Sequence, residues 1–206
     1  MKLKYILTLL LPFISAYAQP TPEEGLKRLM EGNLRFSQDQ SLHPDRTSER
    51  RKETKKAQSP FAIILGCSDS RVSPEILFDQ GIGDLFIVRV AGNVAGVIEL
   101  ASIEYAALYL HTCVLVVLGH ENCGAIEAVI SGNTKDIQPI ADLIKPAIED
   151  AKKLTGCHHT NTIKTNVCFV AEQLKKQPKL KKLIDEGSLL IKGGYYNFHT
   201  GKVELL

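Results

Sequence analysis

The chain has 206 residues, of which 44% are hydrophobic and 23% are charged. This length and balance fit one ordinary globular domain with a sizeable core. The formal net charge is only +2, and a chain so close to neutral is not expected to bind nucleic acid or an anionic membrane surface.

The first 18 residues are typical of a secretory signal peptide. Lys2 and Lys4 precede an apolar run over residues 5–14, and Ala16-Tyr17-Ala18 offers small residues for cleavage after Ala18. The run is too short to span a bilayer, so no membrane span is expected in the mature chain. Cleavage removes two lysines and no acid, which lowers the net charge from +2 to 0. We therefore expect a periplasmic or secreted protein with one domain over residues 19–206. The alternative is a buried N-terminal helix.

The mature chain is expected to begin with a helix followed by a polar arm. Thr21, Pro22 and Glu24 match a helix N-cap, a first-turn proline and a capping box, and this helix is expected to end near Ser37. Residues 38–60 are polar and basic and are expected to hold at most one short helix. We interpret them as a solvated face, although such an arm can also wrap around a second subunit.

From residue 61 onward, apolar runs alternate with segments of helical spacing. Strands are expected over 62–65, 84–90, 114–119, 189–191 and 202–205. Helices are expected from 73 up to the glycines at 81 and 83, over 97–110, 123–130, 140–154 and 162–176, and in a short segment that ends at 186. Pro146 is expected to kink or split its helix. Arg89, which interrupts the second strand, is expected to pair with a carboxylate or to lie at an interface. The alternation predicts an α/β fold with a mainly parallel central sheet flanked by helices.

Two of the predicted strands end in glycine and are followed by side chains that can bind a metal ion. The first continues as Gly-Cys-Ser-Asp-Ser-Arg from residue 66, and the other as Gly-His-Glu-Asn-Cys-Gly from residue 119. In open α/β sheets, ligands bind beyond the carboxyl ends of the strands. Cys67, His120 and Cys123 therefore provide two thiolates and an imidazole, which zinc prefers, and leave a fourth position for water. The alternative is a closed structural zinc site, with Asp69 as its permanent fourth ligand.

Five cysteines in an exported protein would normally suggest disulfides. Cys67 and Cys123 are better explained as metal ligands. The three remaining cysteines are an odd number, so they cannot all form disulfides within the chain. Cys113 and Cys168 are interpreted as small buried apolar residues, and a Cys157–Cys168 bridge stays open.

The combination of C-S-D-S-R-V with G-H-x-x-C-G resembles the β-class carbonic anhydrases. The resemblance extends to EGLKRLMEGNLRF near the start, to IVRVAGNV and SIEYAALYL in the middle, and to GGYYNFHTGKVELL at the end. It implies a parallel sheet flanked by helices, with N-terminal helices that clasp a partner in a homodimer or a higher homo-oligomer.

By this resemblance, Cys67, His120 and Cys123 bind one Zn²⁺ per chain, and Asp69 and Arg71 form the pair that gates the metal. The implied reaction is the reversible hydration of carbon dioxide to bicarbonate and a proton, with a zinc-bound hydroxide as the nucleophile. Asp69 would orient that hydroxide, and Arg71 would hold Asp69 away from the zinc. The family's substrate-pocket positions match Gln58, Phe86, Ala91, Tyr105 and Gly124 here, although Ala91 replaces a larger valine.

Other readings stay open at this point. The same motifs would suit a hydrolase of carbon disulfide or carbonyl sulfide, or a zinc-binding relative without turnover. Arg71 could be an ordinary surface ion pair. No proton shuttle is assigned among the remaining histidines, which are His43, His111, His158, His159 and His199.

The resemblance also bears on whether the site is open at neutral pH. In one branch of the family, the aspartate at the position of Asp69 binds the zinc when the pH falls and so blocks the water site. This closure is linked to a bicarbonate pocket made by a tryptophan, an arginine and a tyrosine. The matching positions here are Ile64, Arg89 and Tyr196, and the chain contains no tryptophan. Ile64 cannot donate a hydrogen bond, so we expect weak or no inhibition by bicarbonate and an open site in which Asp69 pairs with Arg71.

Overall fold

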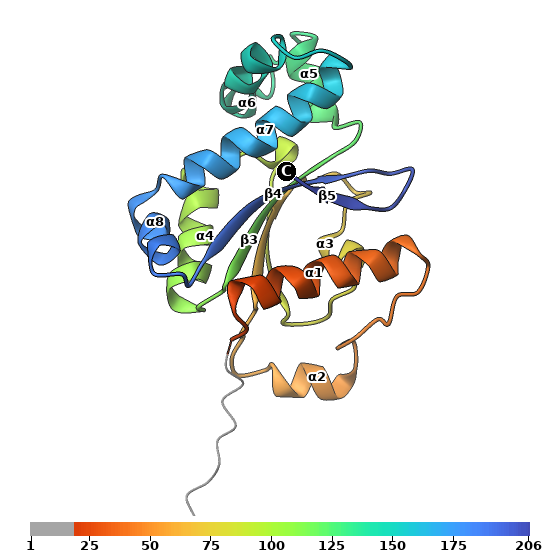
Figure 1. Cartoon of the computed structure of the whole chain (residues 1–206), viewed down its shortest axis with the longest axis vertical. Coiled ribbons are helices and arrows are strands. Elements are labelled where there is room, and N and C mark those ends of the chain that lie inside the picture. The colour runs from red at the N-terminus through yellow and green to blue at the C-terminus, as the bar shows by residue number, and fades with distance from the viewer. Residues whose placement is uncertain (1–18) are drawn as a thin grey trace, which may run out of the picture.

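The computed structural model describes residues 19–206, and the predicted signal peptide lies outside the described residues. One five-stranded sheet forms the centre of the molecule (Figure 1), with the strand order β2-β1-β3-β4-β5. The strands are β1 (Ala62–Gly66), β2 (Leu85–Arg89), β3 (Val114–His120), β4 (Leu190–Tyr196) and β5 (Val203–Leu205). All adjacent pairs are parallel except β4 with β5. The predicted α/β class with a mainly parallel sheet is confirmed.

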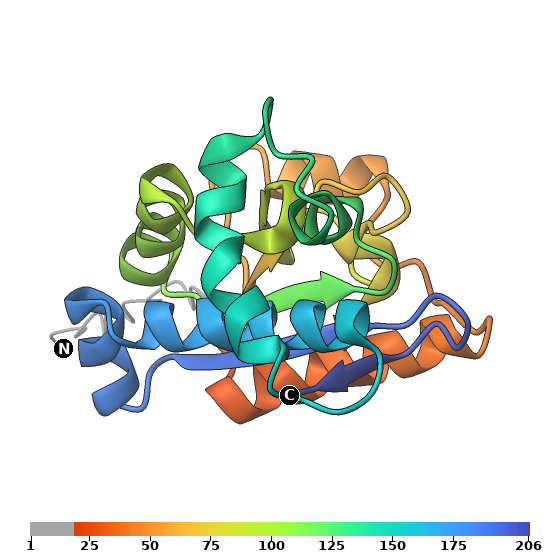
Figure 2. The same ribbon diagram turned by 90° about the horizontal axis from the view of Figure 1, so that it is seen from above.

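Helices cover both faces of this sheet (Figures 1 and 2). One face packs against α4 (Val97–Tyr109), α7 (His158–Lys175) and α8 (Pro178–Asp185), and the other against α1 (Pro22–Ser37) and α3 (Pro74–Leu77). The helices α5 (Gly124–Ile130) and α6 (Gln138–Ala151) lie together at one end of the molecule, where they enclose a third apolar cluster. A 3-10 turn, Ala91–Asn93, follows β2. Among residues 19–206, no helix combines the length and apolar character that crossing a bilayer requires.

The N-terminal helix forms as its sequence predicts. Thr21 and Glu24 make the reciprocal capping box, with Pro22 in the first turn. Leu29 is fully buried against the sheet of its own chain, so one face of α1 is used within the subunit. The predicted contact of this arm with a partner stays a prediction.

The polar arm holds one short helix, α2 (Ser48–Glu53), as expected. However, the interpretation of its charges as a solvated face is wrong for Arg50. Its Nε donates to the carbonyl of Ile82 at 2.8 Å, and its guanidinium lies 3.5 Å from the buried carboxylate of Asp84. Arg50 therefore attaches the arm to the loop before β2.

The helix after β1 is shorter than predicted. It ends at Leu77, well before Gly81. Asp79 has a positive φ of 45° and its carboxylate accepts bonds from Arg35 and from the backbone of Leu42 and His43. These long-range contacts, which local spacing does not reveal, end the helix.

Several predictions in the C-terminal half also need correction. Pro146 does not split α6, which continues from Gln138 to Ala151 with its apolar side buried, and a kink at this residue stays a prediction. The helix α7 begins four residues earlier than expected, at His158, and β4 continues five residues further, to Tyr196. Cys168 is exposed rather than buried. Cys157 is also exposed, and within the described chain all five cysteines are free thiols.

Candidate metal centre

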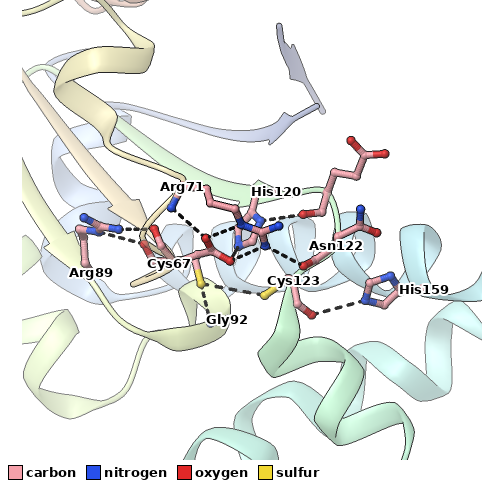
Figure 3. A network of polar contacts seen from close by, with 10 residues as sticks. Cys67, Arg71, Arg89, Gly92, His120, Asn122, Cys123 and His159 are labelled. Carbon is pink, nitrogen blue, oxygen red and sulfur yellow. Dashed lines mark hydrogen bonds and ion pairs between the residues drawn. The ribbon is translucent and has the colours of Figure 1, made fainter. Parts of the chain in front are cut away.

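Three residues with metal-binding side chains meet at the carboxyl edge of the sheet. Cys67 directly follows β1, His120 is the last residue of β3, and Cys123 caps the N-terminus of α5. Because β1 and β3 are parallel neighbours, with Gly66 opposite Leu118, their ends deliver these side chains to one place (Figure 3).

The three ligand atoms form a compact buried cluster. They all lie within 4.8 Å of one another, and the two sulfur atoms are 4.0 Å apart. Two sulfur atoms that each lie about 2.3 Å from one zinc ion in tetrahedral geometry are separated by about 3.8 Å. The spacing of the thiols therefore fits a zinc ion.

The imidazole of His120 is also oriented to bind a metal ion. Its Nδ1 lies 2.8 Å from the carbonyl oxygen of Glu121 and donates a proton to it, which leaves the lone pair on Nε2. Nε2 is buried and has no hydrogen-bond partner within residues 19–206. A buried polar atom without a partner is unfavourable, and a metal ion provides the partner.

The two thiols share one charge. The Cys123 thiol donates a hydrogen bond that lowers the pKa of Cys67, and His120 and the Gly92 N–H act in the same direction against the effect of burial. The pKa of Cys123 is raised because it donates that bond and is itself buried. Zinc binds thiolates, so Cys67 is already prepared as a ligand.

A carboxylate held by an arginine lies at the edge of the cluster. Arg71 Nε donates to Asp69 Oδ1 at 2.9 Å, and Arg71 Nη2 donates to Asp69 Oδ2 at 2.7 Å. These two bonds hold the pKa of Asp69 well below its usual range, in spite of partial burial. Asp69 Oδ2 lies 3.8 Å from His120 Nε2, so an ionised carboxylate adjoins the predicted ligands.

Within the described residues, Arg89 pairs with backbone carbonyls and not with a carboxylate, and the alternative expectation, that it lies at an interface, stays a prediction. Its Nε donates to the carbonyl oxygen of Cys67 at 2.9 Å, and its Nη2 donates to that of Asp69 at 2.6 Å (Figure 3). The guanidinium thereby fixes the backbone of the loop that carries both residues.

Comparisons with known proteins agree on one family. A family model described as carbonic anhydrase matches residues 62–203. A carbonic anhydrase of Mycolicibacterium smegmatis is 37% identical over 192 residues, which make up 89% of this chain and 93% of the relative. Carbonic anhydrase 2 of Mycobacterium tuberculosis is 34% identical over 192 residues, which make up 89% of this chain and 92% of the relative.

Solved structures indicate which class of carbonic anhydrase the chain resembles. The β-carbonic anhydrase CcaA matches with a TM-score of 0.69 and 26% identity, covering 88% of this chain and 87% of that one. A Coccomyxa β-carbonic anhydrase in complex with acetazolamide matches with a TM-score of 0.70 and 26% identity, covering 88% and 86%. The chain belongs to the β-carbonic anhydrase family.

The pocket positions expected of a β-carbonic anhydrase fall into two groups. Ala91 opens the 3-10 turn beside Cys67, and Gly124 follows Cys123. A side chain at Gly124 would meet no atom of the described chain within 4 Å, so open space adjoins the cluster there.

The other three pocket positions lie away from the cluster within one chain. Phe86 is paired with Ile63, which lies three residues before Gly66 at the end of β1. Three residues of a strand span about 10 Å, so Phe86 lies about that far from the strand end that carries the cluster. Its ring centroid is 6.2 Å from that of Tyr105 on α4, and Tyr105 shares a surface hollow with Gln58. These residues form a group of their own at the β2 edge.

Several residues at the site of this β-carbonic anhydrase were not singled out from the sequence. Phe198 contacts both Arg71 and His120, Glu121 supports His120, and Asn166 hydrogen-bonds the backbone next to Cys67. Glu121 lies inside the recognised motif, and its neighbour His120 is the only signal that could have found it. Phe198 and Asn166 come from distant segments and carry no local signal.

Proposed function

We propose that this protein catalyses the reversible hydration of carbon dioxide to bicarbonate and a proton, with one zinc ion per chain. The observation that carries the proposal is the buried Cys67–His120–Cys123 cluster beside a carboxylate held by an arginine, in a chain of this family. A closed structural site has no use for the Asp69–Arg71 pair. A catalytic site needs an acceptor next to the reacting water.

The metal would be held by the sulfur atoms of Cys67 and Cys123 and by Nε2 of His120. When bound, zinc lowers the pKa of a coordinated water from about 15.7 to about 7 and so supplies a hydroxide nucleophile near neutral pH. Two thiolates and a neutral imidazole balance the charge of the ion, which suits an uncharged substrate.

Asp69 orients the nucleophile. The carboxylate is ionised at neutral pH, since its pKa is depressed by Arg71, and an ionised carboxylate only accepts hydrogen bonds. From its place beside His120, Asp69 would accept a hydrogen bond from the hydroxide that a bound zinc supplies, and would so direct an oxygen lone pair toward the carbon of carbon dioxide. Arg71 occupies both carboxylate oxygens and keeps Asp69 from binding the metal.

This arrangement is expected to resist closure by bicarbonate. The Arg89 guanidinium already donates to two backbone carbonyls, and Ile64 is an apolar, fully buried side chain. A buried anion that lacks one hydrogen bond is disfavoured by roughly 1–3 kcal/mol. Bicarbonate titrations of activity at pH 7.5 should show weak inhibition at most, and an Asp69 oxygen bonded to zinc in a crystal grown at that pH would contradict the open site.

The proposal is tested by stopped-flow carbon dioxide hydration with the purified mature protein and a zinc determination on the same sample. We expect about one zinc per chain and a kcat/KM on the order of 10⁴–10⁸ M⁻¹s⁻¹. Carbonyl sulfide and carbon disulfide are assayed in parallel. Turnover of either of these without carbon dioxide hydration would refute the proposal, as would full zinc content without turnover.

Substitution of the ligands tests the metal set. Cys67→Ser, His120→Ala and Cys123→Ser should each reduce zinc to well below one per chain and remove activity, because three protein ligands are needed to hold the ion. Cys113→Ser is the matched control, since this thiol is also buried but bonds only to backbone carbonyls. A ligand variant that keeps full zinc and wild-type turnover would exclude that residue from the set.

The proposal includes a homodimer or higher homo-oligomer and export from the cytoplasm. An apolar stripe on α4 supports the former and is discussed below. The composition of residues 1–18 supports the latter. Intact-mass measurement of protein from the native host should give a chain that begins at Gln19, whereas a full-length cytosolic product would rule out export.

A further inference from the structure

Phe198 lies in the turn between β4 and β5, and its half-buried ring contacts residues of the site. The guanidinium carbon of Arg71 lies over the ring, 4.5 Å from its centroid. The rings of His120 and Tyr196 approach it in edge-on geometry, with centroids 5.6 Å and 5.2 Å away. One aromatic side chain therefore contacts both a predicted zinc ligand and the predicted gating arginine.

Glu121 fixes the backbone that carries this ring. Its carboxylate accepts a hydrogen bond from the Phe198 N–H at 3.0 Å, and its own N–H donates to the carbonyl of Tyr196 at 2.9 Å. The carbonyl of Glu121 accepts the bond from His120 Nδ1. The turn is thus attached to the end of β3 at the residue that follows the histidine.

Arg71 needs such support. Its side chain is 53% exposed, whereas that of Asp69 is 17% exposed. An exposed ion pair by itself contributes little, because a long side chain must be held in one geometry against its rotamer entropy. The edge of the guanidinium is occupied by Asp69 and by the carbonyl of Asn122, which lies 3.3 Å from Nη2 (Figure 3). Its flat face is available to an aromatic ring at the same time.

We infer that Phe198 is a positioning residue, which holds the Arg71 guanidinium against Asp69 by a cation–π contact while Glu121 holds Phe198. This inference deepens the proposed function, because the orientation of Asp69 depends on Arg71. It assigns a role to the β4–β5 turn, which contributes no predicted metal ligand or substrate-pocket residue.

The first test does not depend on activity. Protons above an aromatic ring are shielded, so the Arg71 Nε–H proton of the zinc-loaded wild type should resonate upfield of the Nε–H proton of Arg35, which also donates to a carboxylate. Its assignment comes from its loss in Arg71→Lys. In Phe198→Leu the signal should move downfield and exchange faster with water. An Arg71 signal without an upfield shift in the wild type would overturn the inference, whether or not the variants fold.

The second test uses carbon dioxide hydration by the same proteins. Phe198→Leu keeps an apolar side chain but removes the ring, and should lower kcat/KM by about 2- to 30-fold, the range of a cation–π contact. Phe198→Tyr should restore the rate to within about 2-fold, and zinc content should stay at one per chain in both. Glu121→Ala should resemble Phe198→Leu, and Glu121→Gln should be milder, since the amide oxygen can still accept the Phe198 N–H.

Phe36→Leu is the matched control. Phe36 belongs to the same aromatic cluster, with its centroid 6.5 Å from that of Tyr196, but the Arg71 guanidinium lies over Phe198 and not over Phe36. Phe36→Leu should therefore affect stability and leave kcat/KM unchanged. Wild-type activity in Phe198→Leu would overturn the inference, and so would a loss that Phe198→Tyr does not restore. An inactive wild type with an upfield Arg71 signal would refute the proposed function and leave the positioning intact.

Discussion

Asn166 is the residue through which α7 supports the metal centre. Its Nδ2 donates to the carbonyl of Gly92 at 2.9 Å, and the N–H of Gly92 points at Cys67 Sγ from 3.4 Å. Gly92 has a φ of 74°, which a residue with a side chain adopts only with strain. The amide thus holds a glycine whose N–H stabilises the Cys67 thiolate.

Asn166→Ala should therefore weaken zinc binding while the three ligands remain. Loss of an outer hydrogen bond at a metal site typically reduces affinity about 10- to 100-fold, and we expect the lower end, because Asn166 acts through the backbone. Competition with a chromophoric chelator measures the effect. Thr162→Val on the same helix is the control, since the Thr162 hydroxyl donates to the carbonyl of His158 and, within residues 19–206, makes no bond to the metal-site loops. Equal zinc affinity in both variants would exclude this role for Asn166.

At the scale of residues, the sequence was informative where chemistry is concentrated in short motifs. Cys67, His120 and Cys123 follow glycine-terminated strands, and parallel strands place such residues at one edge. Asn166 and Phe198 could not be found in this way, because each reaches the site only through the packing of a distant element. An asparagine within a helix and a phenylalanine in a turn have many ordinary explanations.

At the scale of elements, α7 lies unusually close to the sheet because two strand positions are glycine. A β-carbon at Gly119 would lie 2.5 Å from Val167, and one at Gly193 would lie 2.8 Å from the same residue. This close approach is what lets the neighbouring Asn166 reach Gly92. It also explains why the length of β4 was underestimated, since glycine is normally unfavourable in strands but is required here by the helix.

Asp79 connects the loop after α3 to α1 and to the polar arm. Its side chain is fully buried and is bonded by Arg35 of α1 at 2.7 Å and by the N–H groups of Leu42 and His43 at 2.9 Å. Burial acts to raise the pKa of Asp79, but the N–H groups of Leu42 and His43 and the Arg35 guanidinium outweigh it, so the pKa lies below its usual value. The charged form therefore stabilises the folded state.

Asp79→Asn should lower the free energy of unfolding by about 2–3 kcal/mol at pH 7, because Arg35 and two backbone groups lose a charged acceptor. Since the folded pKa is depressed, the wild-type advantage is complete above the unfolded pKa of about 3.9 and is lost as the pH falls through the folded value. Urea unfolding of the wild type and of Asp79→Asn at pH 7 and pH 3.5 should thus show a smaller difference in the free energy of unfolding at the lower pH.

The control for Asp79 is Glu149→Gln. It removes an exposed pair with Lys152 and should change stability by no more than about 0.5 kcal/mol at either pH. If the free energies of unfolding of wild type and Asp79→Asn differ by the same amount at both pH values, the carboxylate charge does not contribute to stability.

At the scale of the whole molecule, β2 forms one edge of the sheet, and no other strand of residues 19–206 pairs with its outer side. The edge strand β2 lies beside α4, whose outer side carries exposed apolar residues, with Val97 83% exposed, Ile98 74% and Tyr109 72%. The spacing of Ile98, Tyr105 and Tyr109 places them on one helical face. Contiguous apolar surface of this kind marks an interaction site, and an exposed edge strand offers unpaired backbone groups. A second copy of the chain fits both features.

The same surface carries Gln58, Phe86 and Tyr105, the three pocket positions that lie apart from the metal cluster. In the proposed oligomer, we expect them to contribute to the proposed carbon dioxide site of a neighbouring copy, across the interface. Sequence comparison alone could identify these positions, but it could not place them, because it does not distinguish residues of one subunit from those of its neighbour.

Ile98→Asp combined with Tyr109→Asp should convert the protein to monomers at micromolar concentration, because two apolar residues of the proposed interface become charges and a hot-spot residue near the centre of an interface is worth about 2 kcal/mol or more. Light scattering coupled to size exclusion measures the state. The variant should keep one zinc per chain, since the ligands lie within a single subunit, yet lose most carbon dioxide hydration. Leu154→Asp is the control, because Leu154 is 55% exposed in the loop after α6, away from this surface. A wild type that is monomeric and fully active, or an α4 variant that remains dimeric, would refute this interface.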